Sequence, residues 1–105
     1  TGAVPRALPL LQRAASLAPT EARPHLVLAN ALRKHGDMSG AITHYRKAIA
    51  LDDDLAEAHN NLGIVLEARG ELEPAAAAFA RAQAIDPRQP LYGSNLARVQ
   101  AQLGR

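Results

Sequence analysis

The chain has 105 residues, a formal net charge of +2 and no cysteine. This length corresponds to one domain, and without cysteine the chain has neither a disulfide nor a thiolate metal ligand. Acidic and basic residues are interspersed, without the basic tract of a nucleic-acid-binding protein, and no apolar run reaches the ~20 residues that span a bilayer. Nearly half of the residues are apolar, mostly Ala and Leu, and only three are aromatic. This composition favours helices.

The first predicted helix begins near Pro5 and ends before Pro19. Apolar residues between them recur at helical spacing, and Pro5 suits a first helical turn. Because proline removes a backbone donor, Pro9 is expected to move the start toward residues 7–9 or to bend the first turn. Residues 1–4 are expected to be disordered.

The next two helices are predicted over residues 21–35 and 38–51. Thr20 is the expected N-cap of the first of them. Gly36 can adopt the left-handed conformation that closes a helix, and Asp37 can then cap the helix that follows. The turn between the two helices is therefore expected to be short.

Three further helices are predicted over residues 55–69, 72–85 and 89–103. The acidic run at residues 52–54 has two interpretations, a cation site or a cap that interacts with the dipole of the next helix, and we favour the cap. Gly70 is expected to end that helix. No segment has the pattern of a strand, so the sequence indicates an all-α chain of six helices.

The same residue types recur at a constant spacing along the chain. The positions that share this spacing include Leu28, Leu62 and Leu96, the glycines Gly36, Gly70 and Gly104, and the large residues Leu11, Tyr45 and Phe79. The period, about 34 residues, lies within the range of about 20 to 50 residues that indicates a stacked-repeat architecture.

The repeated unit resembles the tetratricopeptide repeat, whose first helix carries Trp, Leu-Gly and Tyr and whose second carries Ala, Phe, Ala and Pro. The central unit has His59, Leu62, Gly63, Leu66, Ala75, Phe79, Ala82 and Pro87 at the corresponding places. It departs from the pattern with His for the Trp and Leu for the first Tyr. The resemblance covers nearly the whole chain and implies a right-handed superhelical solenoid of antiparallel helix pairs.

The resemblance also implies how the chain is divided. It gives a single domain over residues 1–105, with a half repeat at 5–19, repeats at 22–55 and 56–89, and a half repeat or capping helix at 90–104. Gln100 stands where the preceding units have Leu, so the last helix is expected to be a solvated cap.

The first half repeat has no comparable cap. We expect either more chain before it or self-association of its open face near Leu8, Leu11 and Ala15. The chain starts without Met, which we interpret as a piece of a longer protein. The bias toward Arg and Ala is typical of a GC-rich genome, and we expect a bacterial source.

By resemblance, the first helix of each repeat lines the concave face of the superhelix. The residues expected there as a peptide-binding site are Asn30, Arg33, Asn60, Asn61, Ile64, Asn95 and Arg98. Asn offers both a donor and an acceptor to a peptide unit, and rows of Asn resemble the asparagine ladders of O-linked N-acetylglucosamine transferases. In the alternative interpretation these asparagines bond only to their neighbours or to water.

Basic residues predicted on the same face (Arg23, Arg33, Lys34 and Arg98) favour an acidic partner peptide, unless they are simply a solvated helix surface. Asn30 and Asn61 match two positions of the carboxylate clamp of chaperone-binding adaptors. The basic positions of that clamp are not basic here, so the clamp itself is expected to be absent.

The four histidines do not indicate a metal site. His25 and His59 replace the Trp of the family and are expected to pack, whereas His35 and His44 lack the i, i+4 spacing of a helical metal site. The sequence has no convincing Ser-His-Asp ordering, no Gly-rich phosphate loop and no carboxylate pair in an evident pocket. We therefore expect no metal, no cofactor and no catalysis.

These inferences support two hypotheses. The first is a non-catalytic interaction scaffold that binds a peptide segment of a partner in its concave groove. The second is a substrate-recruiting or oligomerising segment of a larger enzyme, such as a glycosyltransferase or a sulfotransferase. The expected partner is a protein or peptide rather than nucleic acid or membrane, and the expected compartment is the cytoplasm.

Overall fold

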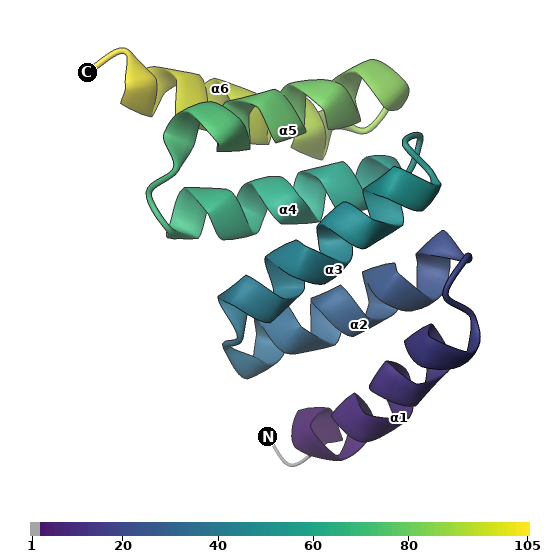
Figure 1. Cartoon of the computed structure of the whole chain (residues 1–105). Helices are drawn as coiled ribbons and strands as arrows, with labels where there is room; N and C mark the ends of the chain where they lie inside the picture. The colour runs from purple at the N-terminus through teal and green to yellow at the C-terminus, as the bar shows by residue number, and fades with distance from the viewer. Residues whose placement is uncertain (1–2) are drawn as a thin grey trace. The chain divides into compact units, whose positions relative to one another are not determined.

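The computed structural model describes the backbone of residues 3–105 and the side chains of residues 7–105. The described part of the chain contains six helices and no strand (Figure 1), which confirms the predicted all-α repeat fold. The helices are α1 (Ala3–Leu17), α2 (Ala22–His35), α3 (Met38–Leu51), α4 (Ala56–Ala68), α5 (Leu72–Ile85) and α6 (Pro90–Leu103). Within these residues, no helix combines the length and the apolar character that a membrane crossing requires.

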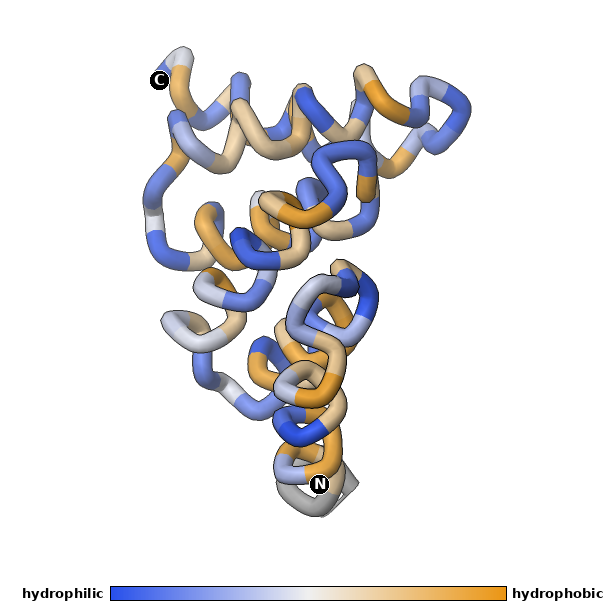
Figure 2. Tube along the Cα trace, turned by 45° about the vertical axis from the view of Figure 1, so that its right-hand side comes forward, coloured by the Kyte–Doolittle hydropathy of each residue, from blue (hydrophilic) through white to orange (hydrophobic). Residues whose placement is uncertain are grey.

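Tertiary contacts group the chain into two units, residues 1–53 with α1 to α3 and residues 54–105 with α4 to α6. In the first unit α2 packs against both α1 and α3, and in the second α5 packs against both α4 and α6. Hydrophobic and hydrophilic residues alternate along the helices (Figure 2), so each helix has an apolar side to bury. The predicted repeat bounds within a single domain stay a prediction.

The first helix starts earlier than predicted. It begins at Ala3 and contains Pro9 in its interior. The first four N–H groups of a helix have no partner inside the helix, so Pro5 removes no hydrogen bond and Pro9 removes one. The prediction of disorder is wrong for Ala3 and Val4, and Thr1-Gly2 lies outside the described residues.

Two predicted caps are wrong. Glu21, not Thr20, is the N-cap of α2, because the Glu21 N–H donates to the Ala18 carbonyl and places Thr20 inside that turn. Leu55, rather than an aspartate of the acidic run, is the N-cap of α4. The Asp54 carboxylate lies 3.4 Å from Arg81 of α5 instead.

The turn between α2 and α3 forms as predicted. Gly36 has φ of +95°, a left-handed conformation that glycine adopts without strain, and the Asp37 N–H donates to the Leu32 carbonyl at 2.8 Å. The Asp37 side chain accepts a hydrogen bond from the Gly40 N–H at 2.9 Å. Both residues therefore satisfy backbone groups that the helix ends leave open.

Close helix contact in the second unit depends on a glycine. A Cβ atom on Gly63 of α4 would lie 2.7 Å from the ring of Phe79 of α5, closer than real side chains approach. Phe79 itself is fully buried. The Leu62-Gly63 pair of the repeat pattern thus lets the Phe79 ring reach the α4 backbone. Gln100 of α6 is exposed, as expected for the solvated last helix.

Candidate functional site

Three of the predicted site residues are buried asparagines of the second unit. Asn60 and Asn61 lie on α4 and Asn95 lies on α6, and their exposed fractions are 4%, 9% and 4%. A buried amide has to find hydrogen-bond partners, because an unpaired one costs ~1–3 kcal/mol. Their mutual arrangement shows how this requirement is met.

The asparagines form a chain of hydrogen bonds between α4 and α6. The Asn95 Nδ2 donates to Asn60 Oδ1 at 2.8 Å, and the Asn60 Nδ2 donates to Asn61 Oδ1 at 3.3 Å. The Asn95 Oδ1 in turn accepts from Arg98 Nη1 at 2.9 Å. Four predicted site residues are therefore brought together.

Arg98 is also held by a carboxylate of α4. Its Nε and Nη2 atoms donate to the two carboxylate oxygens of Glu67 at 2.9 and 2.6 Å, and Gln102 Nε2 donates to Glu67 Oε2 at 3.2 Å. The bond from Arg98 lowers the pKa of Glu67. We call Asn60, Asn61, Glu67, Asn95, Arg98 and Gln102 the α4–α6 polar network.

The network runs from the interior to the surface. Its asparagines are buried, the Glu67 side chain is 18% exposed and the Arg98 side chain is 48% exposed. Ile64, the remaining predicted site residue of this unit, is half-buried on α4. Arg98 is thus the member of the network that a partner reaches most easily.

In the first unit the two predicted site residues share one partner. Arg33 of α2 donates from Nε to the hydroxyl of Tyr45 at 3.2 Å, and that hydroxyl donates to Asn30 Oδ1. Tyr45 is fully buried on α3. These bonds anchor Asn30 and Arg33 to the core of their own unit.

Sequence reasoning missed the partners of both arginines. In the repeat, Arg98 occupies the position that lies one helical turn before Glu67. This small offset along neighbouring helices was a signal that the two opposite charges could meet. For Arg33 the signal was Tyr45, which stands where the next unit has Phe and therefore adds a hydroxyl that needs a partner. The asparagines were singled out, but not their burial.

The histidines behave as predicted for packing residues, with one addition. His25 and His59 are buried, at 7% and 8% exposed. His44 of α3, which the sequence did not link to another residue, hydrogen-bonds with His25. Within residues 3–105, no group of three or more His, Asp or Glu side chains could hold a metal ion.

The open face proposed for α1 has a different composition from the expected one. Ala15 is buried, at 4% exposed, and Leu8 and Leu11 are half-buried. The large apolar side chains that α1 exposes are Leu10 and Leu17, at 71% and 74%. Self-association through this helix stays a proposal.

Comparison with protein families gives two matches. A TPR repeat model matches residues 29–70, and a tetratricopeptide repeat model matches residues 56–89. Together the two models cover more than half of the chain. A curated relative is the cellulose synthase operon protein C of Xanthomonas axonopodis pv. citri (strain 306), 35% identical over 104 residues. That alignment covers 95% of this chain and 7% of the relative.

Solved structures with the same fold include several peptide complexes. The crystal structure of MamA superposes with a TM-score of 0.91 and 25% identity, over 96% of this chain and 55% of MamA. The first TPR of Spaghetti (RPAP3), bound to an HSP90 peptide, gives 0.94 and 18% identity over 99% and 82%. The Yersinia enterocolitica type III secretion chaperone SycD, in complex with a YopD peptide, gives 0.89 and 20% identity over 96% and 82%.

Proposed function

We propose that this chain, which belongs to the tetratricopeptide repeat family, is a non-catalytic interaction scaffold that holds a peptide segment of a partner protein. One observation carries the proposal: the α4–α6 polar network joins three buried asparagines to an arginine that is half-exposed. The peptide complexes of two proteins with this fold support it. The predicted concave groove is the expected location.

The chemistry of Arg98 selects the kind of group that it binds. A guanidinium has five N–H donors, and three bonds to Glu67 and Asn95 leave two donors for a ligand. Because Glu67 already balances the charge of Arg98, a neutral acceptor suits these donors better than a second carboxylate. We therefore expect Arg98 to donate to a backbone carbonyl of the peptide.

The asparagines position Arg98 and offer amide groups of their own. An Asn side chain can both donate to a peptide unit and accept from it. An extended peptide that displaces part of the network can therefore replace the hydrogen bonds that the Asn side chains lose. Ile64 on α4 and Leu91 on α6, which is 50% exposed, supply apolar surface in the same unit. Asn30 and Arg33 are proposed contacts of the first unit.

The proposal is tested by selecting peptides from a random library on the immobilised chain and measuring their affinity by calorimetry. Arg98→Ala and Asn61→Ala should each weaken a selected peptide about tenfold, which is ~1.4 kcal/mol. Arg88→Ala is the matched control, because Arg88 is an exposed arginine of the same unit outside the network. Equal affinities for all four proteins would show that the peptide binds elsewhere.

A second candidate function is a recruiting or oligomerising segment of a larger enzyme system. The observation that favours it is the relative whose length this chain covers by only 7%, and which is a protein of a cellulose synthase operon. In this function the same surface holds a substrate or an enzyme subunit rather than a free signalling peptide. The glycosyltransferase that the sequence suggested as one example is consistent with this setting.

The two candidates are separated by the coding sequence on either side of the chain. A catalytic domain encoded in the same frame favours the second candidate, and its kcat/KM should then fall when Arg98→Ala is introduced while its activity on a minimal soluble substrate is unchanged. Further repeats alone on both sides favour the free scaffold. In that case the selected peptide should match a sequence in a separate protein of the same organism.

A further inference from the structure

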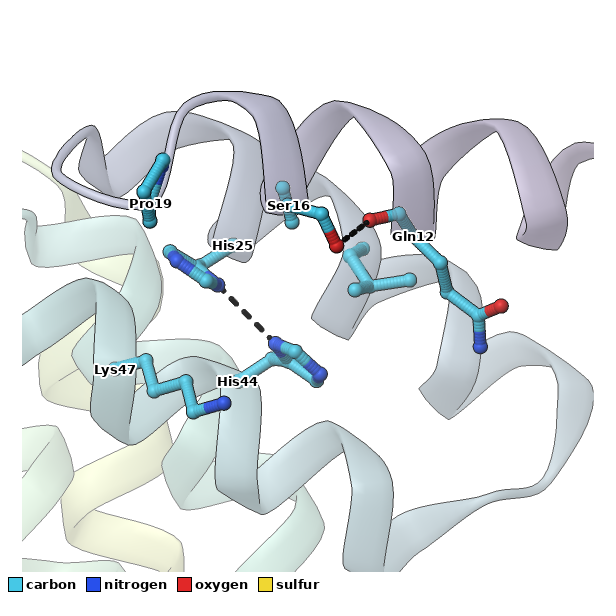
Figure 3. Close-up of a pocket in the computed structure, with 8 residues that line it drawn as sticks. Gln12, Ser16, Pro19, His25, His44 and Lys47 are labelled. Carbon is cyan, nitrogen blue, oxygen red and sulfur yellow. Dashed lines mark hydrogen bonds between the residues drawn. The ribbon is translucent and has the colours of Figure 1, made fainter.

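A cavity of about 330 Å³ lies among the three helices of the first unit (Figure 3). Its lining residues are Gln12, Ala15 and Ser16 of α1, Pro19, His25 and Leu28, and His44 and Lys47 of α3. This volume is near the lower end of pockets that bind small ligands. None of these residues belongs to the α4–α6 polar network, so the following inference does not rest on the proposed function.

Two imidazole rings meet in this cavity. The Nδ1 atoms of His25 and His44 are 3.2 Å apart, and the ring centroids are 5.4 Å apart with an angle of 18° between the planes. Since the centroids are much farther apart than the nitrogens, the rings face each other through their Nδ1 edges, as Figure 3 shows. One Nδ1 must donate and the other accept, so a single proton occupies the space between them.

The charges around the pair are mainly positive. Lys47 lines the cavity from α3, the helix that also carries His44. Burial, Lys47 and His25 lower the pKa of His44, and Asp37 opposes them. The Asp37 carboxylate already caps α3 at Gly40. Helix α1 contributes the uncharged Gln12 and Ser16, and the lining contains no carboxylate.

This arrangement suits an anion better than a metal ion. The nitrogen edges of His25 and His44 point at each other rather than at a common third point, and the Lys47 ammonium would repel a cation. An anion, in contrast, would be attracted by Lys47 and would favour protonation of the imidazole pair. The pair can take up one proton and keep its hydrogen bond, because an imidazolium donates to a neutral imidazole.

We infer that this cavity binds the carboxylate of an acidic side chain from a partner protein, with Lys47 as the fixed cation and the His25–His44 pair taking up a proton on binding. A cavity of about 330 Å³ has room for one acidic side chain. The apolar residues Ala15 and Leu28 can contact the methylene groups of that side chain. Binding and proton uptake are then linked, so acidification strengthens binding.

The inference is tested by NMR titration of the histidine ring protons with the peptide N-acetyl-Glu-Glu-amide. The rings of His25 and His44 should shift together and saturate, and N-acetyl-Gln-Gln-amide should leave them unchanged. Affinity should rise several-fold from pH 8 to pH 6, with an upper limit of about tenfold per pH unit for one proton. Proton uptake should also appear as a calorimetric heat that depends on the buffer.

Two variants and one control test whether the acidic peptide binds at this cavity. His44→Ala introduces the residue that the second repeat has at the equivalent position, Ala78, so the variant is expected to fold. It should abolish the pH dependence, and Lys47→Gln should weaken binding at least fivefold. Lys34→Gln, which removes an exposed charge outside the cavity, should bind like the wild type.

Three results would overturn the inference. The first is an equal response to the neutral peptide or an unchanged affinity in Lys47→Gln. The second is a response to ZnCl₂ at both rings with none to the acidic peptide, which would assign a cation site. The third is tighter, Lys47-dependent binding of inorganic phosphate than of the acidic peptide, which would assign a free anion instead of a protein side chain.

Discussion

In the first unit the largest buried ring is that of Tyr45, and in the second, at the equivalent position of the repeat, it is that of Phe79. The Tyr45 hydroxyl receives a hydrogen bond from Arg33 and donates one to Asn30. Phe79 has no such group, and its unit has Ile64 and Glu67 at the positions that correspond to Asn30 and Arg33.

The Tyr45 hydroxyl, together with the residues at these two positions, distinguishes the polar contacts of the two units. In the first unit Asn30 and Arg33 of α2 hydrogen-bond to the hydroxyl of Tyr45. In the second unit the polar side chains of α4 hydrogen-bond to those of α6. Asn60 and Glu67 of α4 accept from Asn95 and Arg98 of α6. The packing positions of the repeat therefore persist, while its polar positions are free to change their partners.

The largest expected effect comes from the small residue beneath the ring. Gly63→Ala places a Cβ atom 2.7 Å from Phe79, and overpacking of this kind costs ~1–3 kcal/mol, against a gain of about 1 kcal/mol from helix propensity. We expect a net loss of up to about 2 kcal/mol in the free energy of unfolding. Urea unfolding followed by circular dichroism measures it.

Gly93→Ala is the matched control for this prediction. A Cβ atom at Gly93 of α6 would meet the amide end of the Gln83 side chain, which is exposed and can move aside. This change should therefore be neutral or stabilising by up to about 1 kcal/mol. Equal losses in the two variants would mean that the Phe79 ring does not restrict this crossing.

Packing could be predicted from the sequence because each packing requirement is repeated. The Leu-Gly pair, the small residues and the large rings recur with one period, and these positions gave the helices to within a few residues of their observed ends. The start of α1 was predicted less well. The prediction moved the start because of Pro9, although the loss of one backbone hydrogen bond did not prevent the helix from beginning at Ala3.

The polar partners could not be predicted in the same way. The burial of Asn60 and Asn95 depends on how close α4 and α6 lie, and the pairing of Arg98 with Glu67 depends on side-chain rotamers. The predicted basic surface is therefore less positive than its composition indicates. That these residues bind a peptide stays a prediction, and the bonding among them required three-dimensional distances.

Tyr45→Phe gives the first unit the ring of the second. Removing the hydroxyl takes away the hydrogen bonds to Arg33 and Asn30, and the net cost of a lost hydrogen bond is ~1 kcal/mol. Thr43→Ala removes a hydroxyl from an exposed position of the same helix and should stay within about 0.5 kcal/mol of the wild type. Urea midpoints that coincide for all three proteins would contradict the anchoring by Tyr45.

Glu67→Gln tests the ion pair of the second unit. The pair is partly exposed, and such pairs contribute about 0.5 kcal/mol. Because the folded pKa of Glu67 is lowered from 4.5, this stability is present above pH 4.5 and is lost as the pH falls through the lowered value. A double-mutant cycle with Arg98→Gln should give the coupling at pH 7 and none at pH 2, whereas a coupling independent of pH would contradict the ion pair.

The smallest expected effect is a pH dependence of stability that comes from His44 in the first unit. Since the pKa of His44 is lowered from 6.5 in the folded chain, its stabilising contribution is present above pH 6.5 and is lost as the pH falls through the lowered value. His44→Ala should therefore lose less stability than the wild type between pH 7.5 and pH 5, by less than about 0.5 kcal/mol, the range of changes near a surface. Thr43→Ala, one residue away and without a titrating group, should keep the wild-type pH profile. If His44→Ala also keeps it, the imidazole pair contributes no pH-dependent stability between pH 7.5 and pH 5.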